Sequence, residues 1–361
     1  TGFLDARTLH SALRIGTEED ALPEDKRSDI EAGLIVVDET SMVDQWLARQ
    51  FFTRIRPGTK VVLVGDADQL PSVGAGNVFH ELIECGVIAV TVLDQIFRQA
   101  EDSRIAHNAQ YIHQALTGLL YGDDFVFLKS SDQSNAAKKI CSLYYEAVRE
   151  FGIDHVMILS PFRESGDASA EKLNGIIREE LNPYDEAKGE LRLGNQSFRM
   201  GDRVMQTKND YNIQLRDKKG DLIGAGVFNG DIGTIIGLES DTVNVDYDGR
   251  LASYPLDRVG DLTLAYATTV HKAMGSEYDC VIIPVLRANM RLLNRNLIYT
   301  AITRAKKKVF LVGQKDMLFA AILRHKADQR NTLLGERIQL YYKALSQKRG
   351  RDTGAELKKA V

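Results

Sequence analysis

The stretch LIVVDETSM (residues 34–42) decides the fold class of this chain. Four apolar, mostly β-branched residues lead directly into two adjacent carboxylates. Such a short, uninterrupted apolar run is typical of a strand buried on both faces, as in a parallel sheet covered by helices. The same pattern recurs at residues 61–64, 156–159, 281–285 and 309–312. Because helical stretches separate these runs, we predict an open α/β fold with its chemistry at the carboxyl ends of the strands.

Residues 201–255 break this alternation of strands and helices. Asn229-Gly230 and Asp248-Gly249 separate short apolar runs, and the run at 243–247 alternates between apolar and polar residues. Asn-Gly and Asp-Gly supply the positive φ angles that tight hairpins require. We therefore predict a small antiparallel barrel inserted into the second α/β domain. A β-rich excursion of that same domain is the alternative.

These patterns divide the chain into a series of parts. We predict a first α/β domain over 1–115, a second over 116–200 and 256–330, the insertion over 201–255, and a polar tail over 331–361. The tail is rich in charged residues, which favours a solvated and partly disordered end. A role in nucleic-acid binding is the second interpretation of the tail.

The composition excludes several classes of protein. The 361 residues contain no long apolar run and no basic-then-apolar signal pattern at the N-terminus, so the sequence predicts no membrane span. Cys85, Cys141 and Cys280 are scattered, which fits a reducing cytoplasm and neither a zinc site nor a disulfide framework. The formal net charge of -4 argues mildly against a nucleic-acid partner, but a basic track along one channel would be enough to bind one.

Polar loops follow two neighbouring strands of the predicted sheet. Asp38 and Glu39 end the first strand, and Asp66 and Gln69 lie in GDADQLP after the next. In nucleotide hydrolases the first carboxylate of such a pair holds Mg²⁺ and the second polarises the attacking water. Gln69 suits a phosphate sensor because its amide both donates and accepts hydrogen bonds. The alternatives are a capped helix start for the first loop and an ordinary acidic turn for the second.

At these loops the sequence resembles the RecD-like branch of the superfamily-1 helicases. VVDETSM (36–42) and VGDADQLPSVGAG (64–76) are similar to motifs II and III of that family. Further family motifs lie before and after these two, in the family's order, along nearly the whole chain. They are ARTLHSAL (6–13), LDQIFRQ (93–99), ILSPFRESGDASAEKLN (158–174), TLAYATTVHKAMGSEYDCVIIPV (263–285), LIYTAITRAKKKVFLVG (297–313) and QRNTLLGERI (329–338).

The resemblance implies an ATP-dependent DNA helicase of recombination and repair that uses ATP and Mg²⁺ and moves 5′→3′ on single-stranded DNA. It implies two RecA-like domains, the first of them incomplete, and an SH3-like barrel at 201–255. Its partners would be single-stranded DNA and duplex junctions, with nuclease or helicase subunits as further candidates. It places Arg98 and Arg304 at the γ-phosphate, where the planar guanidinium suits developing charge. Gly275, Glu277 and Asp66 join the nucleotide site, and Asp38 is the implied Mg²⁺ ligand.

The DNA contacts implied by the resemblance follow the sugar–phosphate backbone, as a translocating motor requires. For two of them an alternative stays open, since Phe162 also suits a core position and His10 a capped helix. The implied contacts are His10, Ser160, Phe162, Arg163, Thr268, Thr269, His271 and Lys272.

The chain also departs from the family. The phosphate-binding loop GxxxxGK[ST] does not occur in the 361 residues, so we expect a chain that starts after it, binds ATP weakly and hydrolyses little ATP alone. Met274 stands where the family usually has glutamine, which removes one polar contact. The acidic stretch before Leu34 has no aromatic wedge, so we expect a reduced strand-separating pin. A non-hydrolytic nucleic-acid-binding module acting with a partner is the alternative function, and an ATPase that remodels protein is a third.

Overall fold

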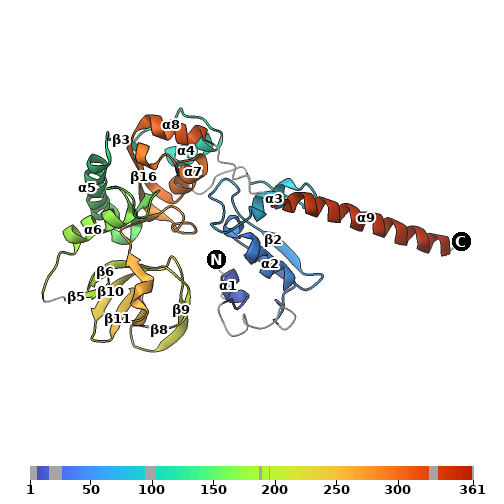
Figure 1. Cartoon of the computed structure of the whole chain (residues 1–361), viewed down its shortest axis with the longest axis horizontal. Helices are drawn as coiled ribbons and strands as arrows, with labels where there is room; N and C mark the ends of the chain where they lie inside the picture. Colours follow the sequence, from blue (N-terminus) through green and yellow to red (C-terminus); the bar gives the residue numbers. More distant parts are fainter. Residues whose placement is uncertain are drawn as a thin grey trace. The chain divides into compact units, whose positions relative to one another are not determined.

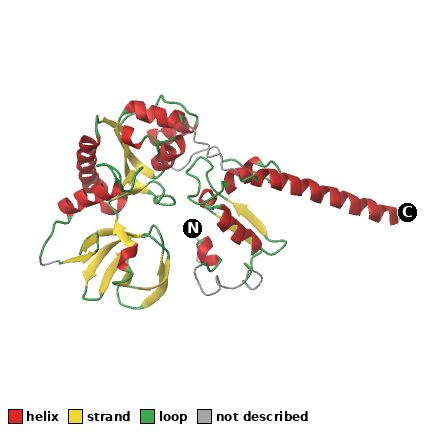
Figure 2. Ribbon diagram, in the orientation of Figure 1, coloured by secondary structure: helices red, strands yellow, loops and turns green. Residues whose placement is uncertain are grey.

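The computed structural model describes residues 6–15, 27–93, 103–186, 189–194, 196–324 and 332–359, with the backbone alone from 348 onward (Figures 1 and 2). Contacts divide the chain into two compact units. The first combines Thr1–Gln95 with Ala327–Val361, and the second is Ile96–Lys326. Parallel sheets with helices occur in both units, which confirms the α/β class.

The first unit is built around a pair of parallel strands. β1 pairs with β2 in register from Leu34 opposite Lys60 to Val37 opposite Leu63. Helix α2 begins where Asp44 accepts a hydrogen bond from the Leu47 N–H at 2.8 Å, as an N-cap residue does. The elements of this unit are α1 (Leu9–Ala12), β1 (Leu34–Val37), η3 (Thr40–Met42), α2 (Gln45–Thr53), β2 (Lys60–Leu63), α3 (Val78–Glu84) and α9 (Leu334–Lys359).

The described helices of the first unit leave one face of this sheet open. Val37 packs into the core with Leu47 and Phe51 from α2. On the other face the side chains of Leu34 and Val36 are 56% and 59% exposed. The prediction that these strands are buried on both faces is therefore wrong for the first unit, because an apolar pattern does not specify what covers it.

The C-terminal residues form a helix. The backbone is helical over α9, and Leu334 and Ile338 in its first turns pack against the core of the first unit. The helical backbone differs from the partial disorder that the sequence predicts, whereas residues 339–347 are exposed, as a solvated end requires. Two apolar residues spaced one helical turn apart give α9 an anchored start.

The second unit contains a five-stranded parallel sheet in the order β14-β4-β15-β16-β3. Every residue of β4 is buried, so here the prediction of strands covered on both faces is confirmed. In Figure 1 the sheet lies between α5 and α6 on one side and α4, α7 and α8 on the other. The elements are α4 (Arg104–His113), β3 (Phe125–Lys129), α5 (Gln133–Phe151), η4 (Ile153–His155), β4 (Val156–Ser160), α6 (Ala170–Leu181), β14 (Ala267–Thr269), β15 (Tyr278–Val285), η6 (Arg287–Asn289), α7 (Arg295–Thr303), β16 (Ala305–Gly313) and α8 (Lys315–Leu323).

Helix α4 belongs to the second unit. It packs against α7 and β16, and its residues Ile105 and Ile112 are buried. The predicted first domain, with its boundary at residue 115, included this helix. The division of contacts falls after Gln95 instead, because the apolar face of α4 finds its partners in the second unit.

The insertion is an antiparallel sheet in the order β13-β7-β10-β11-β12-β8-β9 (Figure 2). The hairpin signal at Asp248-Gly249 is confirmed, since these residues have φ of 54° and 84° and join the paired strands β11 and β12. Asn229-Gly230 forms a turn with φ of 98° at Gly230, but it joins β9 to β10, which do not pair. The sheet extends past the predicted end at 255, and among the described residues its pairings leave β13 and β9 as edges, so they do not complete a closed barrel. The strands are β5 (Glu190–Leu193), β6 (Gln196–Arg199), β7 (Arg203–Gln206), β8 (Asp210–Arg216), β9 (Leu222–Val227), β10 (Ile232–Leu238), β11 (Thr242–Tyr247), β12 (Arg250–Pro255) and β13 (Leu262–Leu264), with η5 (Val259–Asp261) before the last and the β5–β6 hairpin beside the sheet.

Candidate nucleotide and nucleic-acid sites

The carboxyl end of β1 carries Asp38 and Glu39 in a tight, strained turn. Glu39 has φ 51° and ψ 40°, a left-handed conformation that few non-glycine residues adopt. The Asp38 Oδ1 atom accepts the Glu39 N–H at 2.8 Å, and the Thr40 hydroxyl donates to the Val37 carbonyl at 2.9 Å. Backbone strain that surrounding bonds hold in place is typical of functional sites. The turn therefore fits the predicted role of these two carboxylates.

The loop after β2 lies against this turn. The Thr40 N–H donates to the Val64 carbonyl at 2.9 Å. A Cβ atom on Gly65 would lie 3.2 Å from the backbone nitrogens of Thr40 and Ser41, which is tighter than ordinary packing. Glycine at 65 therefore lets the two loops meet, and the structure brings the predicted motif II and motif III residues together.

Asp66 and Gln69 are bound to each other within the second loop. The Asp66 carboxylate accepts the Asp68 N–H at 3.0 Å and the Gln69 Nε2 amide at 3.3 Å. Gln69 is buried, with 8% of its surface exposed. Asp66 therefore shapes the loop and orients Gln69.

The predicted Mg²⁺ ligand fits an open metal site. Asp38 is exposed, and its Oδ1 atom accepts the Glu39 N–H. Among the described residues no three His, Cys, Asp or Glu side chains are grouped as a metal site. Mg²⁺ in nucleotide enzymes uses one or two carboxylates and takes its other ligands from phosphates and water. An exposed carboxylate such as Asp38 could supply the protein ligand of such an ion.

In the second unit, Arg304 lies beside the turn that contains Gly275. Its guanidinium is buried and donates to the Thr300 carbonyl at 3.3 Å and the Ser276 carbonyl at 3.5 Å. Gly275 has φ 79°, and a Cβ atom on it would meet no described atom within 4 Å, so backbone conformation alone favours glycine there. The structure therefore joins the end of motif V to the motif VI arginine.

These residues lie at the edge of the sheet where strands begin. Glu277 precedes β15 and Arg304 precedes β16, and the two strands are parallel. Glu277 also pairs with Lys306 at 3.4 Å. The prediction of chemistry at the carboxyl ends of strands is wrong for Gly275, Glu277 and Arg304, because each of them comes before its strand.

The opposite edge of the same sheet collects cationic side chains. β4 and β14 are adjacent and parallel, with Ser160 opposite Thr269, so the loops after both strands meet there. Partial burial lowers the pKa of Lys272, and the nearby Arg163 guanidinium lowers it further. The backbone N–H of Lys272 lies 3.4 Å from the Thr269 hydroxyl. Arg163, Thr269 and Lys272 therefore form one polar surface from two segments distant in sequence.

Two hydroxyls that were predicted to contact DNA have partners inside the unit. Ser160 is fully buried, donates to the Ala168 carbonyl at 2.8 Å and accepts the Phe162 N–H at 3.3 Å. Thr268 is buried with its hydroxyl 3.9 Å from the Met205 sulfur. This geometry gives Ser160 and Thr268 the task of holding the loops in place, and it does not present their hydroxyls to a ligand.

The other predicted DNA-contacting residues of this edge differ in accessibility. Arg163 is exposed and its Nε atom donates to Glu171 at 2.9 Å. His271 is exposed as a residue, yet partial desolvation of its ring lowers the pKa of the imidazole. Phe162 is half-buried and Met274 is buried. A neutral His271 donates one hydrogen bond, and Arg163 and Lys272 supply the positive charge.

Two further residues were predicted to take part in the sites, His10 and Arg98. His10 lies in the short helix α1, where the Thr8 hydroxyl accepts the Ser11 N–H at 3.2 Å. That geometry agrees with the capped-helix alternative for His10. Arg98 lies outside the described residues.

Sequence reasoning missed Asn174 as a positioning residue. Its side-chain amide donates to the carbonyls of Leu264 at 2.9 Å and Ala267 at 3.0 Å, and its oxygen accepts the Ala267 N–H at 2.7 Å. Asn174 therefore joins α6 to the start of β14, just before Thr268. Asparagine is unfavourable in helix interiors. An asparagine within the helical stretch of α6 was therefore the signal that the sequence offered.

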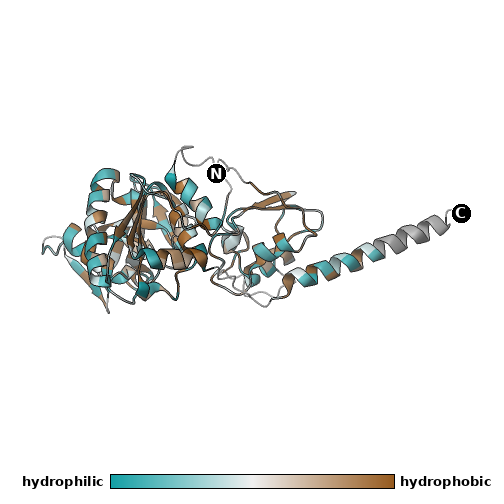
Figure 3. Ribbon diagram, turned by 90° about the horizontal axis from the view of Figure 1, so that it is seen from above, coloured by the Kyte–Doolittle hydropathy of each residue, from teal (hydrophilic) through white to brown (hydrophobic). Residues whose placement is uncertain are grey.

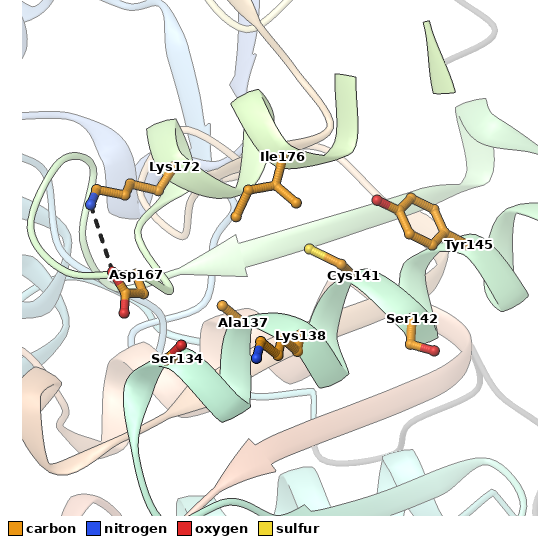
Figure 4. Close-up of a pocket in the computed structure, with 9 residues that line it drawn as sticks. All are labelled: Ser134, Ala137, Lys138, Cys141, Ser142, Tyr145, Asp167, Lys172 and Ile176. Carbon is orange, nitrogen blue, oxygen red and sulfur yellow. Dashed lines mark ion pairs between the residues drawn. The ribbon is translucent and has the colours of Figure 1, made fainter. Parts of the chain in front are cut away.

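A groove of about 560 Å³ lies between α5 and α6 (Figure 4). Lys172 and Asp167 form an ion pair of 3.6 Å at its rim. Burial raises the pKa of the Cys141 thiol in its floor to about 11, which makes that thiol unreactive. None of the predicted site residues lines the groove. The lining residues are Ser134, Ala137, Lys138, Cys141, Ser142, Tyr145, Asp167, Lys172 and Ile176.

Three family models match separate parts of the chain. An AAA domain matches residues 1–121, and a UvrD-like helicase C-terminal domain matches 264–312. The SH3 domain of ATP-dependent RecD-like DNA helicases matches 173–247, which overlaps the antiparallel insertion. The AAA match covers the described part of the first unit up to Leu93 and continues through α4 of the second unit, and the other two matches lie within the second unit.

Curated relatives match along most of the chain. The ATP-dependent RecD2 DNA helicase of Deinococcus radiodurans is 34% identical over 316 residues, which is 85% of this chain and 40% of that protein. The RecBCD enzyme subunit RecD of Mycobacterium tuberculosis is 31% identical over 352 residues, which is 90% of this chain and 56% of that protein. The chain belongs to the RecD-like branch of the superfamily-1 helicases. It spans about half the length of these curated relatives.

A solved structure supports the fold of this RecD-like chain. The Pif1 helicase from Bacteroides in complex with ADP-AlF3 and ssDNA superposes with a TM-score of 0.51 at 19% identity, covering 93% of this chain and 83% of that one. At this identity the match speaks for the fold alone. Within the described residues, no helix of the RecD-like chain has the length and apolar character to cross a membrane.

Proposed function

We propose that this RecD-like protein is the motor of an ATP-driven DNA helicase that moves 5′→3′ along single-stranded DNA and unwinds duplexes during recombination and repair. The observation that carries the proposal is the division of acidic and basic side chains between the two units. The first unit presents carboxylates in a strained turn after β1, and the second presents a buried arginine at one sheet edge and cations at the other.

The nucleotide chemistry divides among a few side chains. Asp38 would hold Mg²⁺, which when bound neutralises charge on the phosphate oxygens. Glu39 would accept a proton from the attacking water, and Gln69 would orient that water or the phosphate it attacks. Arg304, together with Arg98, would hold the charge that develops on the phosphate, because a guanidinium keeps its proton and binds oxygens with a planar fork.

The DNA side of the second unit suits phosphate contacts. Arg163 and Lys272 supply charge, and Thr269 and His271 supply hydrogen-bond donors at the same edge of the sheet. Contacts of this kind follow the sugar–phosphate backbone and tolerate any sequence. The residues between Thr269 and Glu277 run from the DNA edge to the edge that holds Arg304. We infer that this short connection couples DNA binding to hydrolysis.

The relatives support the same reading of partners and cofactors. One is named an ATP-dependent DNA helicase and another a RecBCD enzyme subunit, so single-stranded DNA, duplex junctions and nuclease subunits are the partners we propose. A non-hydrolytic binding module is not favoured by these relatives. A cytoplasmic site of action is part of the proposal, since Cys85, Cys141 and Cys280 are all free and buried.

The test is DNA-stimulated ATPase and unwinding by the full-length protein. We expect hydrolysis that rises with added single-stranded DNA, and unwinding of a duplex with a 5′ tail in preference to a 3′ tail. A polypeptide restricted to these 361 residues, which contain no GxxxxGK[ST], should hydrolyse ATP at background rate. Full-length protein that binds DNA but shows neither stimulation nor unwinding would contradict the proposal and favour the binding-module alternative.

A further inference from the structure

Helix α9 is fixed to the first unit through its first two turns. Glu81 on α3 accepts hydrogen bonds from the backbone N–H groups of Leu334 at 3.0 Å and Gly335 at 3.3 Å. Helix starts leave such N–H groups without partners, so a carboxylate from a neighbouring helix stabilises them. Leu334 and Ile338 pack against the core of the unit, and Gln339 donates to the carbonyl that follows α3 at 2.9 Å. The start of α9 is therefore a fixed part of the unit that carries the catalytic carboxylates.

The anchoring stripe of α9 continues beyond its contact with α3. Tyr341 and Leu345 follow Ile338 at i+3 and i+7, a spacing that places all three on one side of the helix. Tyr341 is 75% exposed, Tyr342 54% and Leu345 57%. Figure 3 shows hydrophobic residues among hydrophilic ones along this part of α9. An exposed aromatic stripe that continues the partly buried contacts of Leu334 and Ile338 marks an interaction surface.

The same stretch is strongly cationic in a chain whose formal net charge is -4. Residues 337–351 contain no Asp or Glu. Arg337 and Lys343 are exposed beside the tyrosines. Aromatic rings next to cations suit a polymer of phosphates and stackable bases, whereas a second copy of α9 would bring like charges together. The cationic residues of this stretch are Arg337, Lys343, Lys348, Arg349 and Arg351.

We propose that α9 is a second contact surface for single-stranded DNA, formed by Tyr341, Tyr342, Lys343 and Arg337. This rests on the proposed helicase function. Of the residues predicted to contact DNA, His10 alone belongs to the first unit. Helix α9 would add further DNA contacts to this unit.

The test measures binding of the full-length protein to a fluorescent oligo-dT strand by anisotropy over a series of salt concentrations. Changing Tyr341→Ala together with Tyr342→Ala should weaken binding by about fivefold or more for each base that stacks on a ring. Changing Lys343→Ala should lower the salt dependence by about one phosphate contact. Affinity in the double alanine variant equal to wild type at every salt concentration would overturn the proposal.

Matched variants separate stacking from other effects. Tyr341→Phe with Tyr342→Phe keeps the rings and should bind as wild type, and a loss as large as that of the alanine pair would overturn the stacking role. Leu340→Ala removes a side chain that is 65% exposed but lies off the stripe, and it should leave binding unchanged. Because these side chains are exposed, circular dichroism and thermal unfolding should match wild type for each variant.

Parallel assays distinguish the possible outcomes. Lys272→Ala, in the second unit, should weaken DNA binding whether or not α9 takes part. If Lys272→Ala weakens binding and the α9 variants do not, the inference about α9 fails and the helicase proposal stands. If the wild-type protein does not bind oligo-dT, the proposed function itself fails. The double alanine variant is also tested for binding to phosphatidylserine vesicles and for self-association in sedimentation. If it loses vesicle binding while its DNA binding is intact, a membrane is the partner and the proposal is overturned. If it loses self-association while its DNA binding is intact, a second copy is the partner and the proposal is overturned.

Discussion

The parallel sheets of the two units start from the same kind of sequence and end in different surroundings. Val36 in β1 and Val281 in β15 each sit in an uninterrupted apolar run. Val281 is fully buried, whereas Val36 is 59% exposed. A β-branched run therefore predicts a strand with two apolar faces, and the elements around it decide how many faces are covered. The described residues of the first unit cover one face of β1, and helices of the second unit cover both faces of its sheet.

The two sheets also differ in the charge they present. Strand β1 of the first unit ends in Asp38 and Glu39, whereas β16 of the second unit begins directly after Arg304. Acids that hold a metal and activate water, and cations that bind phosphates, are complementary parts of one phosphoryl-transfer reaction. If this division is functional, a substitution on either unit should stop the same reaction.

The largest effect should follow loss of Arg304, the arginine that we propose binds phosphate. Arg304→Ala in the full-length protein should lower the DNA-stimulated kcat for ATP by about 10³–10⁵-fold, as loss of an arginine finger does. Arg304→Lys should recover little activity, because lysine lacks the planar fork. In the first unit, Glu39→Gln should lower kcat by about 10²–10⁴-fold. The measurement is steady-state hydrolysis with saturating DNA.

Arg304 is buried, so its variants require a control for folding. Thermal unfolding and single-stranded DNA affinity without nucleotide should stay close to wild type in Arg304→Lys and Glu39→Gln. Substantial hydrolysis by either variant with intact DNA binding would break the proposed division of chemistry between the two units.

The next effect should appear in stability and compares the sheets directly. Val→Thr keeps the shape of the side chain and adds a hydroxyl. Val281→Thr should destabilise the protein by about 1–3 kcal/mol, because the hydroxyl is buried without a partner. Val36→Thr should change stability by less than about 0.5 kcal/mol, as exposed substitutions usually do. Denaturant unfolding, with hydrogen exchange to locate the weakened strand, measures both.

This pair also tests how far the open face of the first unit persists. Equal destabilisation by both substitutions would show that the face carrying Leu34 and Val36 is covered in the full-length protein. In that case residues outside the described ones would cover this face, and the prediction that β1 is buried on both faces would hold.

Much of the fold was accessible from the sequence. The apolar runs predicted the strands, and Asn229-Gly230 and Asp248-Gly249 predicted turns that the structure confirms through positive φ angles. The position of Arg304 was also derivable, since it precedes its strand in the sequence and parallel strands begin at a common edge. The expectation of chemistry at carboxyl ends overlooked that order.

Other features left no pattern in the sequence. The left-handed conformation of Glu39 depends on bonds made by Asp38 and the loop after β2, which no propensity encodes. The sequence predicts that the Ser160 hydroxyl contacts DNA, but in the structure this hydroxyl donates to the Ala168 carbonyl. Contacts of this kind depend on loop geometry and therefore emerge only in three dimensions.

The smallest expected effect concerns pH and the cationic edge of the second sheet. Burial and Arg163 lower the pKa of Lys272, so Lys272 loses its proton at a lower pH than an exposed lysine. The protonated form binds phosphate, so its contribution to DNA affinity is present below that lowered pKa and is lost as the pH rises through it. For single-stranded DNA, the slope of log affinity against log salt concentration should then become shallower by about 0.7, the value for one phosphate contact. Lys272→Arg should keep its salt dependence over the same pH range, because arginine stays protonated. Anisotropy titrations from neutral to alkaline pH make this comparison. Identical pH profiles for the wild type and Lys272→Arg would show that Lys272 does not contact DNA. Arg163 would then be the remaining cation at this edge of the sheet.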